Sequence, residues 1–588
     1  MEYKAPVKEI GFVVEQVAGL AEVLALAAYA EVDRDTAFAV IEQSGRFTSE
    51  VIGPLNRAGD LHPATLADGV VTTTAGFRPA FRQYVEAGWQ GVQHPVELGG
   101  QGLPKLVAAA CLEMLNSASL SFALCPLLTD GAIEALMTAG SHEQQATYIA
   151  PMISGEWTGT MNLTESQAGS DLAQVRTKAV PQDDGSYRVF GQKIFISYGE
   201  HDLADNIVHL VLARTPDAPE GVRGISLFIV PKVLADGRRN DVWCASLEHK
   251  LGIKASPTAV LIYGDGKGEV GSGAVGHRIG DENHGLEYMF IMMNAARFAV
   301  GMQGVAMAER AYQQAVAFAR DRVQSRDMDG SAGTVTITHH PDMRRMLMRM
   351  RALTEAARAL AYWSAGRNDL ALRGDSAARA IYEFMVPVVN GCSTESSIEV
   401  ASLGVQVHGG MGFIEETGAA QLLRDARILT IYEGTTAIQA NDLVGRKTVR
   451  DGGAVAKQIL ALVAATETDL GAAAAFASIR THLAAGRLAL ADVVEHVVTH
   501  ARSDIKGVYA GSVPYLELCG IVFGGWQMAR SALAAQACID AGDGDPFMTA
   551  KIATARFYAE HVLTRAEGLR TAIVEGGESV NALAESAF

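Results

Sequence analysis

The spacing of apolar residues divides the chain into segments with different local structure. Up to about residue 157, apolar residues fill long, alanine-rich stretches such as residues 120–128, and this pattern predicts helices. Glycine and proline interrupt these stretches at residues 88–102, which is typical of a loop. The first part of the chain is therefore predicted to be helical.

Between residues 158 and 280 the apolar runs become short and are bounded by turn residues. The runs at residues 207–212, 225–230 and 259–263 have the length of strands. An Asp-Asp-Gly-Ser turn at residues 183–186 precedes another alternating segment. Several short strands separated by turns predict a β domain in the middle of the chain.

From Leu286 onward the apolar residues return to helical spacing. Those from Leu286 to Met293 fall at i, i+3, i+4 and i+7, and this helix is expected to run on towards Arg322. Further helices are predicted up to residue 446, and Arg-Asp-Gly-Gly at residues 450–453 marks a boundary. The alanine-rich remainder also looks helical.

We therefore expect a mainly α-helical protein with a central β domain. A chain of 588 residues has room for about four domains. The expected units are an N-terminal extension (1–35), an N-terminal helical domain (36–157), a middle β domain (158–280), a helix bundle (281–446) and an additional helical domain (447–588).

The composition excludes several classes of protein. Hydrophobic residues make up 49% of the chain and charged residues 20%, which is ordinary for globular proteins and unlike a disordered chain. The formal net charge of −17 argues against nucleic-acid binding, because contact with phosphates requires a basic surface. None of the six cysteines forms a Cys-x-x-Cys pair, so we expect buried thiols in a reducing compartment.

The N-terminus does not have the pattern of a secretory signal. Its first apolar run, residues 17–32, contains Glu22 and follows three other glutamates, whereas a signal peptide begins with positive charge. No uncharged stretch reaches the roughly 18 apolar residues of a membrane span. We expect a cytoplasmic protein without an integral membrane segment.

Two motif matches are set aside. Residues 266–271 fit Gly-x-Gly-x-x-Gly, but the residues that follow predict a loop, whereas a dinucleotide site requires a helix there. Residues 142–146 resemble His-Glu-x-x-His but lack the second histidine, so we expect them to begin a helix. We expect no metal site.

Two segments of the predicted β domain carry candidate chemistry. Residues 161–171, Met-Asn-Leu-Thr-Glu-Ser-Gln-Ala-Gly-Ser-Asp, would let backbone amides approach an anion or a heteroaromatic ring, or form a capped turn before a helix. Residues 192–197 predict a strand with Phe195 and Ser197 on one face, or a plain core strand.

Two further segments lie in the predicted bundle. Residues 406–413, Gln-Val-His-Gly-Gly-Met-Gly-Phe, indicate close approach of the backbone to a ligand, or a helix break. Residues 431–436, Ile-Tyr-Glu-Gly-Thr-Thr, place Glu433 in an apolar run. Burial there would raise its pKa and make it a usable base near neutral pH, although a buried structural glutamate is the alternative.

In this order and spacing, the four segments resemble the acyl-CoA dehydrogenase family over most of residues 36–446. The ends of the chain are similar to a longer bacterial subclass that acts on long fatty acyl-CoAs or on 3-methylthiopropionyl-CoA, an intermediate of dimethylsulfoniopropionate breakdown. The resemblance implies a helical N-domain, a β-barrel middle domain and a helix-bundle C-domain, followed by an extra helical domain. It also implies FAD, bound without a covalent link between the β domain and the bundle.

The resemblance assigns cofactor contacts within one subunit. Thr164 would bond the pyrimidine edge of the flavin, Phe195 would lie against the isoalloxazine, and Ser197 would reach N5. Gly169 and Ser170 would contact the pyrophosphate, and Ser170 also the CoA side. The full set is Met161, Leu163, Thr164, Gly169, Ser170, Phe195, Ser197 and Thr435.

Other cofactor contacts implied by the resemblance cross between subunits. Arg322 would reach the FAD of a neighbouring subunit, and its adenosine phosphate would be held by Gln406, Val407, Gly409 and Gly410. Sites shared in this way imply a homodimer or homotetramer.

By the same resemblance, Glu433 is the catalytic base. It would remove the pro-R α-proton of an acyl-CoA while the β-hydride moves to flavin N5, and its backbone N–H would help to stabilise the enolate oxygen. Some relatives place the base just before an arginine on the long helix, where this chain has Ala296. The substrate side would be lined by Arg297, Tyr432, Gly434 and Ser170. For Arg297, a role in helix capping or in a salt bridge is an equal alternative.

The expected reaction is oxidation of 3-methylthiopropionyl-CoA to methylthioacryloyl-CoA, with straight medium or long acyl chains as the alternative. Electron-transferring flavoprotein is the expected acceptor. An acyl-CoA oxidase that uses O2 shares the architecture and remains an alternative. A flavin-binding protein without activity is a third possibility, against which the intact Glu433 argues.

Overall fold

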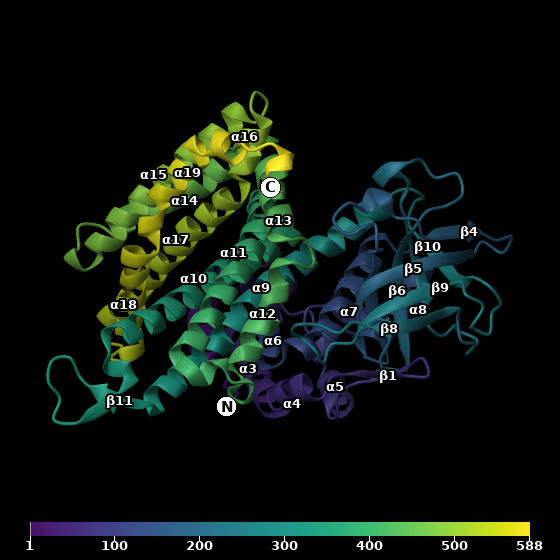
Figure 1. Cartoon of the computed structure of the whole chain (residues 1–588), viewed down its shortest axis with the longest axis horizontal. Coiled ribbons are helices and arrows are strands. Elements are labelled where there is room, and N and C mark those ends of the chain that lie inside the picture. Colours follow the sequence, from purple (N-terminus) through teal and green to yellow (C-terminus); the bar gives the residue numbers. More distant parts are fainter. Residues whose placement is uncertain (1) are drawn as a thin grey trace.

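The computed structural model describes residues 2–588, without the side chains of Ile291 and Met292. Helices form most of the molecule, and a sheet lies at one side of them (Figure 1). The last helices stack on the far side of the bundle from this sheet. The expected class, mainly α with a central β domain and an extra helical domain, is confirmed.

The N-terminal part is helical, as predicted. Its helices are α1 (Val7–Phe12), α2 (Leu20–Leu24), α3 (Arg34–Phe47), α4 (Leu55–Leu61), α5 (Phe77–Glu86), α6 (Lys105–Ala118), α7 (Leu120–Ala139) and α8 (His142–Ile153), with a hairpin of β1 (Thr65–Ala67) and β2 (Val70–Thr72). Ser141 caps α8 with a capping box, so the His-Glu motif there is an exposed helix start.

Among the described residues, α7 is the one helix long and apolar enough to cross a membrane. Within its apolar window, 83% is buried inside the molecule. It lies between the sheet and the bundle, packed against the first strand of the middle domain and the long helix of the bundle (Figure 1). This is the burial of a core helix.

The middle domain contains one eight-stranded sheet. Its strands are β3 (Trp157–Asn162), β4 (Lys178–Pro181), β5 (Tyr187–Ser197), β6 (Asn206–Ala213), β7 (Ser226–Pro231), β8 (Val242–Leu247), β9 (Thr258–Tyr263) and β10 (Ala274–Ile279). The order is β3-β6-β7-β10-β5-β9-β8, with β4 beside β5. Only the β3–β6 pair is parallel in this described sheet.

The sheet folds over on itself along β10. The first half of β10 pairs with β5, through Ala274 and Val189, and its second half pairs with β7, through Ile279 and Leu227. Side chains from both halves fill the interior, among them Phe228 and others from β5, β8 and β9. The outer face of β3, β6 and β7 packs on α7 and α8. The domain is therefore barrel-like, and directly after β5 the Tyr198 hydroxyl donates to the Ser121 carbonyl of α7 at 2.7 Å.

Three long helices form the bundle. They are α9 (Gly285–Asp321), α10 (Pro341–Leu372) and α11 (Ser376–His408), followed by α12 (Ala419–Ala426) and α13 (Thr436–Asp442); a hairpin of β11 (Val323–Arg326) and β12 (Thr334–Thr336) joins α9 to α10. A Cβ built at Gly304 of α9 would lie 2.5 Å from the Ser393 carbonyl carbon of α11. Only glycine permits the two helices to approach this closely.

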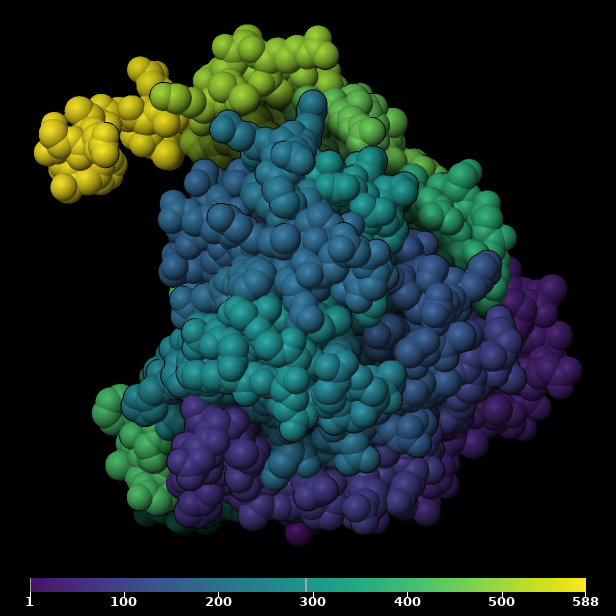
Figure 2. Space-filling view, turned by 90° about the vertical axis from the view of Figure 1, so that its right-hand side faces the viewer, coloured from purple at the N-terminus to yellow at the C-terminus, as the bar shows by residue number. Residues whose placement is uncertain are grey.

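The extra domain consists of α14 (Ala454–Asp469), α15 (Ala477–His500), α16 (Ile505–Ala510), α17 (Ser512–Asp540), α18 (Pro546–His561), α19 (Ala566–Glu575) and α20 (Gly577–Val580). Its long helix α17 packs against the bundle, where Trp526 meets Trp363 of α10 edge to face at 4.8 Å. Beyond α20, exposed C-terminal residues project from the body (Figure 2).

The N-terminal extension packs into the main core. Ile10, Val13 and Val17 are fully buried there. Glu9 bonds the fully buried Lys551 of α18 at 2.6 Å, and Lys551 also bonds Glu355 of α10 at 2.8 Å. The first residues therefore connect the extra domain to the bundle.

Candidate active site

A left-handed turn between α12 and α13 presents the Glu433 side chain. Glu433 has φ +54° and Gly434 has φ +97°. A positive φ is uncommon for glutamate and costs free energy, so the surrounding contacts must hold it. The Gln439 amide donates to the carbonyls of Glu433 (3.4 Å) and Gly434 (3.3 Å), and Thr435 caps α13 by accepting from the Ile438 N–H at 3.3 Å.

The environment of Glu433 favours its neutral form. The side chain is half-buried, and desolvation raises its pKa above that of an ordinary glutamate, while the charge of Arg297 opposes this rise. Arg297 is buried and pairs with Asp442 at 3.5 Å, so the salt-bridge role left open for it is present. Its Nε is buried without a hydrogen-bond partner, and a Cβ at Gly434 would lie 3.8 Å from it.

Tyr432 is held by a series of side-chain hydrogen bonds that could not be predicted from the sequence. Its hydroxyl donates to the Gln303 Oε1 of α9, and Gln303 Nε2 donates to Asn116 Oδ1 of α6 at 3.1 Å. Gln303 and Asn116 are fully buried. The sequence did show that Gln303 and Asn116 are polar residues inside largely apolar helices. It did not show that they contact each other or Tyr432, because the three are distant in sequence.

The loop after β3 is bound to β5 by a buried ion pair. Lys193 Nζ contacts Glu165 Oε1 at 2.8 Å and donates to the Leu163 carbonyl at 2.9 Å. The Ile194 N–H donates to the Thr164 carbonyl at 2.9 Å. The structure thus brings residues 161–171 and 192–197 together, and Lys193 and Glu165 hold them although neither was predicted as a site residue.

Electrostatics explains why this pair stays charged. Burial lowers the pKa of Lys193 to about 8, against the opposing effect of Glu165. Glu165 is desolvated too, but Lys193 and donors from Arg176 and Thr177 outweigh this and lower its pKa to about 2. The stability that Glu165 contributes is therefore complete above the ordinary glutamate pKa and is lost as pH falls towards 2.

A β-bulge turns Phe195 outward from the sheet. The β5–β9 register shifts between Lys193 and Ile196, and Phe195 has φ +60°. Ile196 is buried in the interior, whereas Phe195 is 59% exposed. Ser197 is half-buried. An aromatic residue held in a strained, exposed position beside a polar loop is typical of a ligand site.

The other predicted site residues near the end of β3 are either exposed to solvent or packed against the sheet. Gly169 and Ser170 are exposed, and a Cβ at Gly169 would meet no atom within 4 Å. Met161 is buried with the outer face of the sheet, and Leu163 and Thr164 are half-buried. Exposed backbone at Gly169 leaves room for an anionic group.

The third predicted segment, residues 406–413, lies at the C-terminal end of α11. Phe318 of α9 stacks on His408 at 4.4 Å, which joins the ends of the two helices and brings Arg322 to the same end as residues 406–410. Arg322, Gln406, Gly409 and Gly410 are exposed, whereas the Val407 side chain is buried and leaves only its backbone for a ligand.

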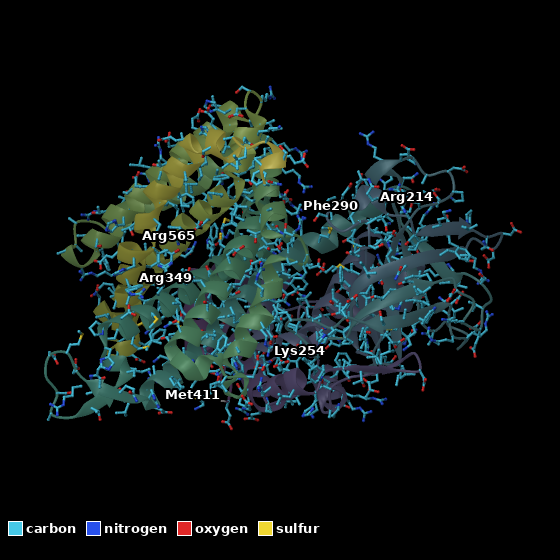
Figure 3. All side chains as sticks on the ribbon, in the orientation of Figure 1. Arg214, Lys254, Phe290, Arg349, Met411 and Arg565 are labelled. Carbon is cyan, nitrogen blue, oxygen red and sulfur yellow. The ribbon has the colours of Figure 1, made fainter. Side chains whose placement is uncertain are left out.

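This segment is far from Glu433 within one chain. Asn390 of α11 donates to the Arg297 carbonyl at 2.7 Å, beside the Glu433 turn. His408 lies 18 residues further along the same helix, which at a rise of about 1.5 Å per residue is about 27 Å. Figure 3 shows the separation, with Met411 at the bottom of the bundle and Phe290 well above it. Phe290 marks the side of the Glu433 turn, because its ring faces Arg446, which binds Asp442, the partner of Arg297.

The sequence matches four family domains in chain order. They are acyl-CoA dehydrogenase, N-terminal domain (residues 62–156), middle domain (160–265) and C-terminal domain (283–447), and acetyl-CoA dehydrogenase C-terminal like (455–584). The 3-methylmercaptopropionyl-CoA dehydrogenase of Ruegeria pomeroyi is 55% identical over 99% of both chains. The chain belongs to the acyl-CoA dehydrogenase family.

A second relative agrees with this assignment, and a solved structure has the same fold. The broad-specificity linear acyl-CoA dehydrogenase FadE5 of Mycobacterium tuberculosis is 34% identical over the full length of both chains. An acyl-CoA dehydrogenase of Bacillus anthracis, solved in complex with FAD, covers 97% of this chain and 92% of its own with a TM-score of 0.77. At 21% identity this last likeness shows the fold alone.

Family membership confirms the expected class of enzyme and its cofactor. The chain is an oxidoreductase that acts on the CH–CH bond of an acyl-CoA thioester with FAD. The residues present fit this cofactor, because the exposed Phe195 offers an apolar face beside the polar edge of Thr164 and the open backbone of Gly169.

Replacing Lys193 with methionine should weaken FAD binding to this acyl-CoA dehydrogenase. The change leaves the Glu165 carboxylate buried without its cation, which costs about 3 kcal/mol or more, and releases the loop from β5. We expect the dissociation constant of FAD, measured by flavin fluorescence, to rise at least about tenfold.

The double variant Lys193→Met/Glu165→Gln should recover part of this loss, because it removes the buried charge. Lys178→Met, at an exposed position on β4, is the matched control and should bind FAD normally. Unchanged FAD affinity in Lys193→Met would show that the ion pair does not position the loop.

Proposed function

We propose that this enzyme oxidises 3-methylthiopropionyl-CoA to methylthioacryloyl-CoA with Glu433 as the base. One observation carries the assignment of the base: Glu433 stands on a left-handed, glycine-backed turn where burial raises its pKa. The substrate class is supported by the name of the relative that shares 55% identity over nearly the whole chain.

Glu433 removes the proton from C2 of the acyl group. A carboxylate with a raised pKa is a stronger base than an ordinary glutamate, and exclusion of water by the substrate raises the pKa further. When bound, FAD would supply the acceptor for the hydride from C3, and Phe195 and Ser197 would hold its ring at the end of β5. The alternative position that the family resemblance suggests for a base, on α9 beside Arg297, holds Ala296, which cannot accept a proton.

The negative charge that develops on the thioester oxygen requires hydrogen-bond donors. Within the described residues, the Glu433 N–H makes no hydrogen bond to protein, so it is available to that oxygen. One such donor contributes about 3 kcal/mol to transition-state stabilisation. Gln439 holds the next peptide of the turn, because its amide donates to the Glu433 carbonyl at 3.4 Å.

We assign Arg297, Tyr432, Gly434 and Ser170 to the substrate side. The Gln303 contact orients Tyr432, and the ion pair with Asp442 orients Arg297. The cofactor side comprises Met161, Leu163, Thr164, Gly169, Ser170, Phe195, Ser197 and Thr435.

We also propose that the cofactor sites are shared between subunits of a homodimer or homotetramer. The separation of about 27 Å along α11 supports this, because residues 406–410 lie far from the Glu433 turn of their own chain. Exposed apolar side chains surround this end of the bundle and suit a subunit contact: Met411, Phe413, Ile414, Val323 and Met328. Arg322 and Gln406 would then reach the neighbouring FAD.

Electron-transferring flavoprotein is the proposed electron acceptor, and the cytoplasm is the proposed compartment. All six cysteines are unpaired, which fits a reducing environment. An oxidase would instead pass electrons to O2. Hydrogen peroxide formed during turnover without added dye would identify that alternative.

A panel of acyl-CoAs tests the substrate assignment. The purified flavoprotein should oxidise 3-methylthiopropionyl-CoA with a kcat/KM roughly tenfold or more above that of palmitoyl-CoA, measured by reduction of an artificial dye. Each methylene of the longer chain that the pocket does not hold costs about 1–3 kcal/mol of transition-state binding. A reversed order would favour the specificity of the FadE5 relative, which acts broadly on linear chains. No oxidation of any acyl-CoA would reject the function.

A further inference from the structure

The β domain contacts the bundle at α12, the helix that precedes the Glu433 turn. The contact is made by the loop between β8 and β9, and Lys254 of this loop lies between the sheet and the bundle in Figure 3. A Cβ built at Gly252 of the loop would lie 2.3 Å from the Arg424 carbonyl oxygen of α12. Only a residue without a side chain permits the loop and the helix to approach this closely.

Asp425 of α12 holds the backbone of the β8–β9 loop. Its carboxylate accepts a hydrogen bond from the Ile253 N–H at 2.5 Å, and both residues are buried. Ile253 has φ +44°, which is a strained conformation for a β-branched residue. Strain of this kind persists only where surrounding contacts hold it, and the bond to Asp425 is such a contact.

Neighbouring charges join the N-terminal domain to the same place. Arg424 binds both carboxylate oxygens of Asp60 on α4, at 2.8 and 2.6 Å, and also donates to the Leu251 carbonyl at 3.1 Å. Lys254 Nζ lies 3.7 Å from Asp60. Three parts of the chain, namely α4, the β8–β9 loop and α12, are therefore connected at one point.

On the side of the β domain, the β8–β9 loop leads directly to the end of β5. Thr258, the first residue of β9, follows Ile253 by five residues and pairs with Ser197. The Tyr198 N–H donates to the Pro257 carbonyl at 2.8 Å, which joins the same two segments once more. A shift of the loop would therefore be transmitted to Ser197, the residue assigned to flavin N5.

On the side of the bundle, α12 leads directly to the Glu433 turn. Residues 427–430 continue α12 as a short 3-10 helix. The Tyr432 N–H donates to the Ile428 carbonyl at 3.1 Å, so hydrogen-bonded backbone extends to the residue before Glu433. A shift of α12 would therefore be transmitted to Glu433.

We propose that Asp425 is a positioning residue: by binding the Ile253 N–H, it fixes the distance between Ser197 of β5 and the Glu433 turn. This inference rests on the proposed function, which gives Ser197 and Glu433 their roles. Asp425 acts through the backbone on both sides and not through contact with the substrate. A misplacement of about 1 Å caused by a remote substitution can reduce a rate about 100-fold.

Asp425→Ala tests this role by stopped flow. The rate constant of flavin reduction at saturating acyl-CoA, per bound FAD, should fall about tenfold to 100-fold, while the dissociation constant of the substrate changes by less than about threefold. Asp425→Asn keeps a carbonyl oxygen for the Ile253 N–H and should stay within about threefold of the wild type. A loss in Asp425→Asn as large as that in Asp425→Ala would overturn the role of this hydrogen bond.

Gly252→Ala disturbs the same contact from the loop. Its methyl group would press on the Arg424 carbonyl and push the loop away from α12. The rate constant should fall as in Asp425→Ala. Because Gly252→Ala leaves the Ile253 N–H with its acceptor, it decides the question if Asp425→Ala does not fold.

Asp241→Ala and Gly268→Ala are the matched controls in the same domain. Asp241 is a buried carboxylate that accepts hydrogen bonds from the backbone N–H groups of residues 266–268 and 273. A Cβ at Gly268 would lie 2.6 Å from the Asn240 carbonyl carbon. Both contacts lie beside the start of β8, at the other end of this strand from the β8–β9 loop. These variants should lower the Tm but leave the rate constant per bound FAD unchanged.

Amide hydrogen exchange provides a readout that does not depend on activity. In the wild-type holoenzyme, the Ile253 N–H should exchange slowly, because it is buried and bonded to Asp425. Asp425→Ala should accelerate exchange in the peptide that contains Ile253, whereas Asp241→Ala should not. Unchanged exchange of this peptide in Asp425→Ala would overturn the inference.

The outcomes separate this inference from the proposed function. If the wild type oxidises no acyl-CoA, the proposed function fails. If the wild type is active, but Asp425→Ala and Gly252→Ala both show the wild-type rate constant, the positioning role is overturned and the proposed function stands. An equal fall in the two controls would show a general loss of stability and would also overturn the positioning role.

Discussion

Glu433→Gln should reduce the rate of acyl-CoA oxidation by roughly 10²–10⁴-fold, the usual contribution of a positioned general base. The amide has nearly the same shape as the carboxylate but cannot take the proton from C2. FAD should remain bound, because the Glu433 side chain is not part of the cofactor set. The rate of flavin bleaching on mixing with substrate, followed by stopped flow, measures the chemical step directly.

The pH dependence provides a second readout of the same group. Because the base must be deprotonated to act and burial raises its pKa, kcat/KM of the wild type should fall with decreasing pH through a pKa above that of ordinary glutamate. The residual activity of Glu433→Gln should lack this fall.

Glu395→Gln is the matched control for the Glu433 substitution. Glu395 is an exposed carboxylate that accepts a hydrogen bond from Thr436 at 2.6 Å, close to the turn. Its replacement should change the rate by less than about threefold, in keeping with a surface contact. If Glu433→Gln retained comparable turnover, the base would have to be assigned elsewhere.

Arg358→Met should destabilise the enzyme more than any surface substitution. The Arg358 side chain is 1% exposed and binds Glu113 of α6 at 2.5 Å and Glu309 of α9 at 2.7 Å. Its removal leaves two buried carboxylates without a cation, at a cost of about 3–5 kcal/mol. We expect a large fall in the apparent Tm of the holoenzyme, or loss of soluble protein.

A compensating variant distinguishes unpaired charge from lost packing. Arg358→Met/Glu113→Gln/Glu309→Gln removes the buried charges together and should recover much of the stability. Arg556→Met breaks an exposed helical pair with Glu560 and should leave Tm nearly unchanged. If the triple variant were as unstable as the single one, packing rather than charge would explain the effect.

Much of the architecture could be predicted from local pattern. The helical spacing after Leu286 matches α9, and the strands expected at residues 207–212 and 259–263 appear as β6 and β9. Such signals are local, because side-chain periodicity and turn residues act within a few positions. The bulge at Phe195 was not predicted, since it depends on the register with β9.

Several contacts that hold the site could not be predicted either, because they join residues that are distant in the sequence. Lys193 lies 28 residues from Glu165, and Gln303 lies 129 residues from Tyr432. Each side chain alone has an equally good interpretation as an exposed polar residue. Only a folded chain shows that these groups are buried, and burial is what makes their pairing necessary.

The sequence by itself determined the family, the order of helical and β segments and the identity of the candidate base, because these depend on residue types at short, fixed spacings. The tertiary structure alone decided the left-handed setting of Glu433, the ion pair behind the β3 loop and the distance between the Glu433 turn and the C-terminal end of α11. Desolvation and close packing act between residues that are distant in the chain, so their effects appear only when the chain is folded.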